Sequence, residues 1–118
     1  INGESQGLAL GTGDSNVIIA AISSGKVVKI NRITVANVDG SSAADVSVKV
    51  VKAAFTSAAT GGAGNVGTIY LAKTISIPAD ASLVLLDTPI YMQTGDALQG
   101  GASAASDLEV FVSYDVIA

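Results

Sequence analysis

The 118-residue chain has no cysteine, no histidine and no tryptophan. Without cysteine it can form no disulfide and offers no thiol for nucleophilic or redox chemistry. Without histidine it lacks the commonest general base and the commonest nitrogen ligand for metals. Neither a Ser-His-Asp nor a Cys-His arrangement is possible. We therefore expect a protein that is not an enzyme.

Charge is also scarce. Charged residues make up 14% of the chain, against a typical share of about 25%. The net charge of −4 disfavours nucleic acid as a partner. Although 49% of the residues are hydrophobic, no apolar run approaches the roughly 18 residues of a spanning helix, so no membrane partner is expected. The surplus of apolar residues predicts surfaces covered by neighbouring subunits, and we expect a homo-oligomer, a trimer or a dimer.

Short apolar segments with a period of two, separated by turn signals, are the dominant pattern. Such spacing is typical of an all-β fold. We predict an antiparallel β-sandwich of about seven to eight strands, either a jelly roll or immunoglobulin-like, with no helix. The predicted strands cover residues 17–22, 27–38, 45–53, 68–77, 82–86, 89–93, 97–104 and 108–117.

One predicted strand changes its pattern midway. In residues 27–38, Val28 and Ile30 share one face, whereas Ile33 and Val35 have the opposite parity. A change of parity inside one strand is what a β-bulge produces, because the extra residue turns the following side chains over. We therefore predict a bulge between Ile30 and Ile33.

A second irregularity lies in residues 68–77. Four apolar side chains alternate on one side of this segment: Ile69, Leu71, Ile75 and Ile77. Lys73 falls among them. A lysine in such a position most often marks an edge strand that is protected against pairing with other chains, and less often a buried functional lysine.

The pattern predicts one domain with an extension. Residues 1–15 are rich in glycine and show no sustained periodicity, so they are predicted to form a flexible N-terminal arm that becomes ordered on a partner. Residues 16–118 are predicted to form a single β-sandwich domain. The loop 55–67 carries four glycines and is the internal segment in which we expect a partner contact.

Four groups of residues were weighed as chemical sites. The glycine-rich stretches 7–13 and 60–65 lack the Gly-Lys-Ser/Thr and helix context of a phosphate loop. Asp14-Ser15-Asn16 is an isolated D-x-N and a poor calcium motif. Three tyrosines could stack on sugars, but core or interface packing is favoured: Tyr70, Tyr91 and Tyr114. We predict no catalytic, cofactor-binding or metal-ligating residue, and no cofactor.

The segment VKINRITVAN at residues 28–37, followed by IYLAKTISIPADASLVLL and GDALQGGASAASDLEVFVSY, resembles a family of small structural proteins from tailed-bacteriophage virions. The matching positions are 33–37, 70–73, 77–79, 82–83, 95–96, 98 and 102–106. The resemblance covers roughly residues 27–117. It consists of strand and turn patterns, with no catalytic signature.

The resemblance implies a non-enzymatic virion subunit on the capsid surface. Its most specific form is a decoration, or cement, protein that stabilises the head by binding the major capsid protein. A tail, neck or fibre subunit and a carbohydrate-binding β-sandwich module are the alternatives. The scarcity of aromatic residues argues against the carbohydrate module.

Overall fold

The computed structural model describes residues 1–57, 59–64 and 66–117. These residues form nine β-strands and contain no helix, and so no helix that could cross a membrane. The strands are β1 (Asn2–Ala9), β2 (Asn16–Ile19), β3 (Val27–Asn37), β4 (Ala44–Lys52), β5 (Gly67–Ile77), β6 (Ser82–Leu86), β7 (Ile90–Met92), β8 (Ala97–Ala102) and β9 (Leu108–Ile117).

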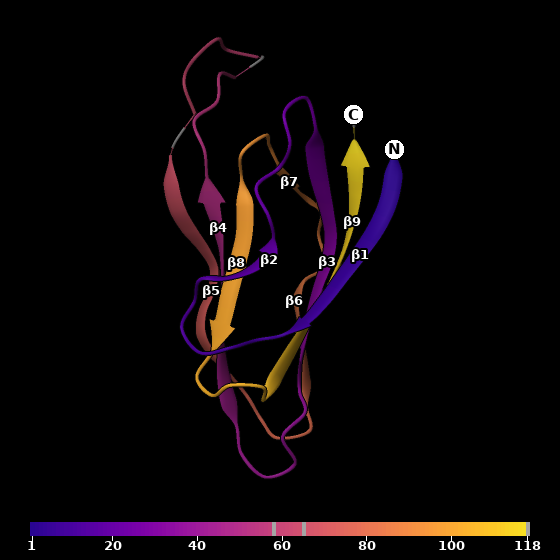
Figure 1. Ribbon diagram of the computed structural model, residues 1–118, viewed down its shortest axis with the longest axis vertical. Coiled ribbons are helices and arrows are strands. Elements are labelled where there is room, and N and C mark those ends of the chain that lie inside the picture. Colours follow the sequence, from indigo (N-terminus) through magenta and orange to yellow (C-terminus); the bar gives the residue numbers. More distant parts are fainter. Residues whose placement is uncertain (58, 65, 118) are drawn as a thin grey trace.

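The strands form two antiparallel sheets that pack face to face (Figure 1). Sheet A has the order β1-β9-β3-β6, with β7 also paired to β3, and sheet B has the order β2-β8-β4-β5. When β6 and β7 are taken as one interrupted strand, the pairs are β1 with β9, β2 with β8, β3 with β6/β7, and β4 with β5. This is a long hairpin rolled into two sheets, the jelly-roll topology. It confirms the predicted sandwich and selects one of the two predicted arrangements.

The core lies between the sheets and is built from alternate residues of the central strands. Side chains of β3 and β9 in sheet A meet those of β4 and β8 in sheet B. The inward residues are buried: Val28, Ile30, Ile33, Val35, Val46, Val48, Leu98, Leu108, Val110 and Val112. The core is almost wholly aliphatic.

The predicted bulge in β3 is confirmed. The β3–β9 register shifts between Ile30 and Arg32, so that Asn31 is the extra residue. Val28 and Ile30 before the shift and Ile33 and Val35 after it are all buried. The bulge therefore keeps both halves of a long strand facing the same core despite their opposite parity in the sequence.

The prediction that residues 1–15 lie outside the sandwich is wrong. Asn2–Ala9 form β1, which pairs with β9 in a continuous register from Asn2↔Val116 to Ala9↔Glu109. Leu10, which follows the strand, is fully buried. Pairing with a distant strand, which local periodicity does not report, holds this polar segment in place. This strand also raises the count above the predicted seven to eight.

Strand β5 differs from its predicted alternation but occupies the predicted place. It lies at the edge of sheet B, as Lys73 indicated. Its register with β4 shifts twice, so that Ala72, rather than Leu71, lies opposite Val48. Thr74 has φ +50°, a strained conformation for a β-branched residue. The strand therefore bends, and it leaves Ile69 and other inward residues partly exposed.

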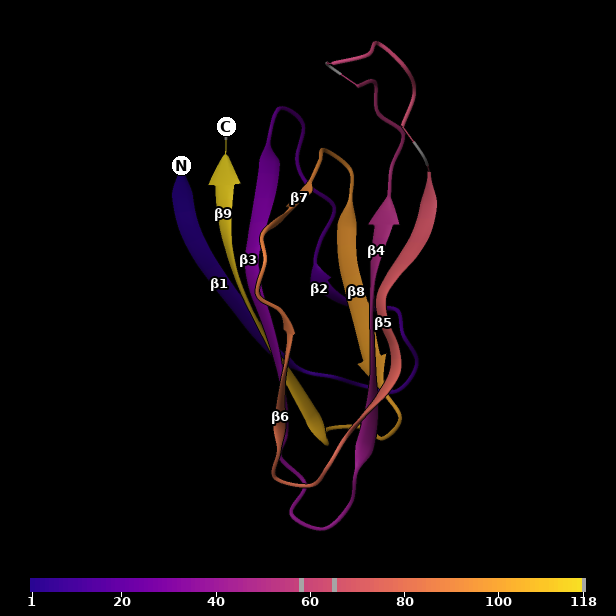
Figure 2. The same ribbon diagram turned by 180° about the vertical axis from the view of Figure 1, so that it is seen from behind.

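The connection between β4 and β5 extends past one end of the sandwich (Figures 1 and 2). Within its described residues the chain folds back on itself, since the Ser57 amide donates to the Gly62 carbonyl and Thr56 forms a bridge with Ala63. The Gly64 amide donates to the carbonyl of Phe55, 2.8 Å away. The connection is thus a short projecting hairpin. Ala58 and Asn65, which belong to the predicted contact loop, lie outside the described residues.

Candidate interaction surfaces

The outer surface of sheet A carries an exposed aromatic ring among very small side chains. Phe111 of β9 is 54% exposed. The strand register places it between Gly7 of β1 and Thr34 of β3, with Val84 of β6 one strand further. We call this surface the Phe111 face; it comprises Gly7, Ala9, Thr34, Ala36, Val84, Glu109 and Phe111.

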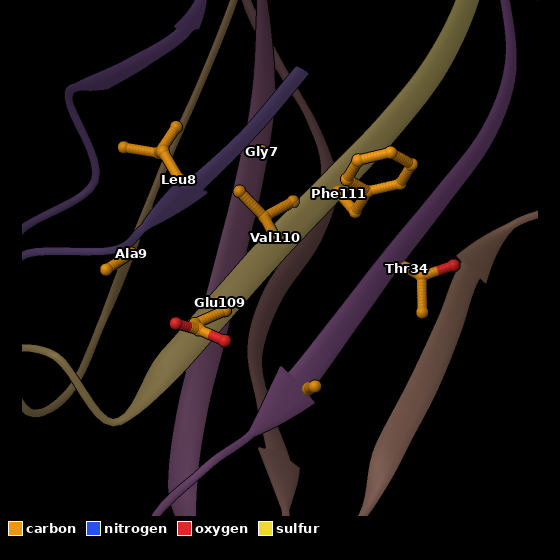
Figure 3. A pocket seen from close by; sticks show the side chains of 8 residues that line it. Gly7, Leu8, Ala9, Thr34, Glu109, Val110 and Phe111 are labelled. Carbon is orange, nitrogen blue, oxygen red and sulfur yellow. The ribbon is translucent and has the colours of Figure 1, made fainter. Parts of the chain in front are cut away.

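The Phe111 face is hollowed beside the ring. A shallow depression of about 380 Å³ lies over β1, β9 and β3, with the Phe111 ring and the Glu109 side chain both extending from β9 (Figure 3). The absence of a side chain at Gly7 makes the ring's position possible, since a Cβ there would lie 3.1 Å from a ring carbon. Because the neighbouring residues are small, the ring rises above the surface beside it. A side chain of a partner could fill the depression next to the ring.

Glu109 gives the Phe111 face a negative charge with no cation across from it. Its neighbours on β1 and β3 are Ala9 and Ala36. Neither of the two ion pairs among the described residues involves Glu109. An exposed carboxylate beside an exposed ring suits a partner that offers an apolar side chain next to a lysine or arginine.

The isolated D-x-N motif does not form a cation site. Asp14 accepts hydrogen bonds from the Tyr70 hydroxyl and from Lys49 Nζ, the latter at 3.2 Å. The Tyr70 hydrogen bond first, and then Lys49, lower the pKa of Asp14 below its ordinary value. Asn16 instead donates to backbone carbonyls, among them that of Gly100 at 3.0 Å. Among the described residues, no three His, Cys, Asp or Glu side chains converge on one point.

The three tyrosines lie on different strands and do not form a platform. Tyr114 is 7% exposed in the core, and its hydroxyl contacts Glu4 and Gln6. Tyr91 is 62% exposed on β7, which pairs with the first part of β3, whereas Phe111 lies opposite Thr34 in the second part. Tyr70 on sheet B lies beneath the Lys73 ammonium, 4.9 Å from its ring centre. Tyr114 thus packs in the core as predicted, while Tyr91 is available to a partner.

The projecting hairpin is anchored by a buried carboxylate. Asp96 is fully buried between the hairpin's base and the turn after β7. It accepts hydrogen bonds from the amides of Ala53 and Gln93, both at 2.9 Å, and pairs with Lys52 at 2.5 Å. Burial alone would raise the pKa of Asp96, but these three donors together lower it. The first residues of the hairpin are therefore held rigidly to the sandwich.

Two glycines of the hairpin have structural roles. Gly61 has φ +70°, which permits the tight reversal. A Cβ at Gly64 would collide with the ring of Phe55. The segment joins two strands, whereas a phosphate loop leads from a strand into a helix. The phosphate-loop interpretation therefore has no support in the described residues.

Phe111 and Glu109 were not singled out from the sequence, although a signal was present. Residues 108–117 alternate strictly, and Phe111 is an aromatic residue on the side of that alternation that carries the polar residues Glu109, Ser113 and Asp115. An aromatic residue with outward parity on a central strand points to a covered surface. The small neighbours at Gly7 and Ala9 could not be found this way, because they belong to the strand that the sequence did not predict.

No family model, no curated protein and no solved structure matches this chain.

Proposed function

We propose that this protein is a non-enzymatic structural protein of a bacteriophage virion, and specifically a decoration protein that binds the major capsid lattice. The observation that carries the proposal is the Phe111 face, an apolar and acidic surface on the broad side of a rigid sandwich. The virion assignment itself rests on the resemblance of residues 27–117 to small phage structural proteins.

Two of the motifs that carry the resemblance contain residues that connect separate parts of the fold. The motif at 33–37 ends in Asn37. The side-chain Nδ2 of Asn37 donates to the backbone carbonyls of Ser42 and Ile77 at 3.0 and 2.9 Å. These bonds tie the end of β3 to the β3–β4 loop and to β5. The motif at 95–96 contains the buried Asp96. These two motifs of the resemblance therefore include residues that hold the sandwich together.

A single Phe111 contact is weak, which fits a lattice-binding role. Full burial of a phenylalanine contributes about 1.5–3 kcal/mol, and about half of this side chain is still exposed. One such contact therefore supplies about 1 kcal/mol. Stable attachment needs further contacts, for which the projecting hairpin and Tyr91 are available, or several copies bound at once. Repetition on a lattice adds such contacts through avidity.

A carbohydrate-binding role is the second candidate, and one observation favours it. A depression of about 290 Å³ on sheet B has carboxylate, hydroxyl and ammonium groups among its lining residues. Hydroxyl-rich ligands are recognised by such groups, and jelly rolls occur in lectins as well as in viral capsids. The lining residues include Asp14, Asp45, Ser47, Lys73, Thr74 and Ser103. None of the three tyrosines is among the residues that line this depression, so it has no aromatic stacking platform.

Co-sedimentation with purified capsids tests the proposal. The wild-type chain is expected to pellet with capsids at a saturable stoichiometry. Phe111→Ser is expected to weaken binding by about fivefold per contact, because about 1 kcal/mol of apolar burial is lost. Val17→Ser is the matched control, since Val17 is 52% exposed on sheet B, away from the Phe111 face.

Two outcomes would count against the proposal. A wild-type chain that stays in the supernatant with capsids, and instead binds tail or neck assemblies or a glycan array, would replace the decoration role with one of the alternatives. Capsid binding that Phe111→Ser and Val17→Ser leave equally intact would keep the capsid role but show that another surface makes the contact.

A further inference from the structure

The outer edge of β1 presents unpaired backbone groups. Among the described residues, only β9 pairs with β1. The Leu10 amide donates to the Leu108 carbonyl at 2.8 Å, which continues the β1–β9 register by one residue. Because the direction of the backbone groups alternates along a strand, even-numbered residues of β1 face β9 and odd-numbered residues face away. Gly3, Ser5 and Gly7 therefore direct their amides and carbonyls outward.

The other three sheet edges carry features that discourage pairing. β2 is four residues long and its register shifts. The β6–β7 edge is interrupted by residues 87–89, which include Pro89. β5 has two register shifts and carries Lys73. Short strands, prolines, bulges and lysines are the devices by which natural sheets keep their edges from pairing.

β1 has none of these devices. It runs for eight residues in continuous register with β9, and it contains neither lysine nor proline. Its one charged residue is Glu4, which is directed toward Tyr114 on the inner side. Such an edge is a template for a further strand. The question is then which strand fits it.

A second copy of β1 fits this edge. In an antiparallel pair of β1 strands, residues whose backbone groups face outward must lie opposite each other. The two-fold axis must therefore pass through a residue of the strand and not between two residues. Centring on Glu4 would place two carboxylates opposite each other, and centring on Gln6 would place Glu4 against Leu8. Centring on Ser5 places Glu4 opposite Gln6 of the second copy and pairs glycine with glycine, so no charge or bulk opposes the contact.

We propose that two copies of this protein associate through their β1 strands, antiparallel and with Ser5 on the two-fold axis, so that the two A sheets become one continuous sheet. The pairs Gly3–Gly7, Ser5–Ser5 and Gly7–Gly3 each contribute two backbone hydrogen bonds, about six in all. The interface is isologous, and it therefore gives a closed dimer and not a filament. In that dimer both copies of the Phe111 face lie on the same side.

This inference deepens the proposed function and rests on it for the advantage of a dimer: two Phe111 faces on one side double the contacts with a lattice. The geometry of β1 supports the dimer without any capsid. Sedimentation equilibrium of the purified chain alone therefore tests the dimer, and capsid co-sedimentation tests the function separately. A monomeric protein that pellets with capsids and a dimeric one that does not are distinguishable results.

The variants act at Ser5. Ser5→Pro removes an amide that faces outward and leaves the hydrogen bonds to β9 in place, so it is expected to abolish the dimer and keep the monomer folded. Ser5→Thr keeps the amide and is expected to remain dimeric. Far-ultraviolet circular dichroism and thermal unfolding verify that both variants are folded.

A charge exchange tests the position of the axis. Ser5→Lys and Ser5→Glu each place like charges opposite each other, and each is expected to raise the dimer dissociation constant by roughly fivefold. An equimolar mixture of the two variants is expected to form a heterodimer at least as tight as the wild-type dimer. A chain that is monomeric at about 100 μM, or a dimer that Ser5→Pro leaves intact, would overturn the proposal. Failure of the mixture to recover affinity would overturn the Ser5-centred register.

Discussion

The buried carboxylate of Asp96 offers the sharpest test of how the fold is held together. In Asp96→Asn, one of the two oxygens that receive hydrogen bonds becomes an NH2 group. The new NH2 group faces a donor in either orientation: Lys52 Nζ and the Gln93 amide where it replaces Oδ2, or the Ala53 amide where it replaces Oδ1. The charge that pairs with Lys52 is also gone. Hydrogen bonds to a charged group contribute about 1.5–3 kcal/mol each, and breaking one side of a buried ion pair costs about 3–5 kcal/mol.

We therefore expect Asp96→Asn to lower the free energy of unfolding at pH 7 by about 3 kcal/mol. For a chain of this length, each kcal/mol corresponds to roughly 4–6 °C, so the melting temperature should fall by about 15 °C. Urea unfolding followed by circular dichroism measures both quantities. Asp87→Asn is the matched control, because Asp87 is an exposed turn residue and its replacement is expected to change stability by less than about 0.5 kcal/mol.

The same substitution has a defined dependence on pH. The pKa of Asp96 is lowered in the folded chain, so its stabilising contribution is complete above the ordinary value of 3.8 and is lost as the pH falls through the folded pKa. The difference between wild type and Asp96→Asn should be constant from about pH 5 to 7 and shrink below about pH 4. A loss smaller than about 0.5 kcal/mol at pH 7, or a difference that grows on acidification, would refute this reasoning.

Three further changes have expected outcomes. Gly101→Ala should destabilise the fold by about 3 kcal/mol or more in urea unfolding, because the new Cβ would collide with the carbonyl of Gly13; wild-type stability would contradict that packing. Tyr114→Phe should lower stability by about 1 kcal/mol through loss of the contact with Glu4, measured in the same way, and an unchanged midpoint would show that the hydroxyl contributes nothing. Phe111→Ser should lower the free energy of unfolding by only about 1 kcal/mol, since about half of the side chain is already exposed, and a loss of about 3 kcal/mol or more would place Phe111 in the core.

The sequence predicted those parts of the fold that leave a local pattern. The eight predicted strands are present, and the parity change in β3 identified a bulge at Asn31 because side chains that must reach one core reveal an extra residue between them. Lys73, a lysine among alternating apolar residues, identified its strand as an edge strand, and β5 lies at the edge of sheet B. Strand order leaves no local trace, so the choice of the jelly roll required the structure.

The rest depends on contacts between residues far apart in the chain. β1 is a strand because β9, more than a hundred residues away, supplies its hydrogen-bond partners, while its own side chains are polar and exposed. Two of the three partners of Asp96 lie 43 and 44 residues earlier, at Ala53 and Lys52. In β8, the structure places the Gly13 backbone directly against Gly101. No periodicity encodes such close approaches.

The candidate surface was partly within reach of the sequence. The parity of Phe111 in residues 108–117 is a signal that the sequence analysis did not use, and its significance depends on the flat surroundings that β1 and β3 provide. The loop at 55–67 was expected to be a contact segment, and that expectation remains a prediction. Its described residues form a hairpin that projects from the sandwich, a shape that suits a contact.

Electron cryo-microscopy of capsids incubated with the purified protein tests the central claim most directly. We predict additional density at repeated positions on the outer surface of the capsid, into which the sandwich fits with the outer face of sheet A and Phe111 toward the major capsid protein. Capsids that remain bare at saturating protein concentration would contradict the decoration role. Density that seats the sandwich through sheet B, with Phe111 directed to solvent, would contradict the assignment of the contact face.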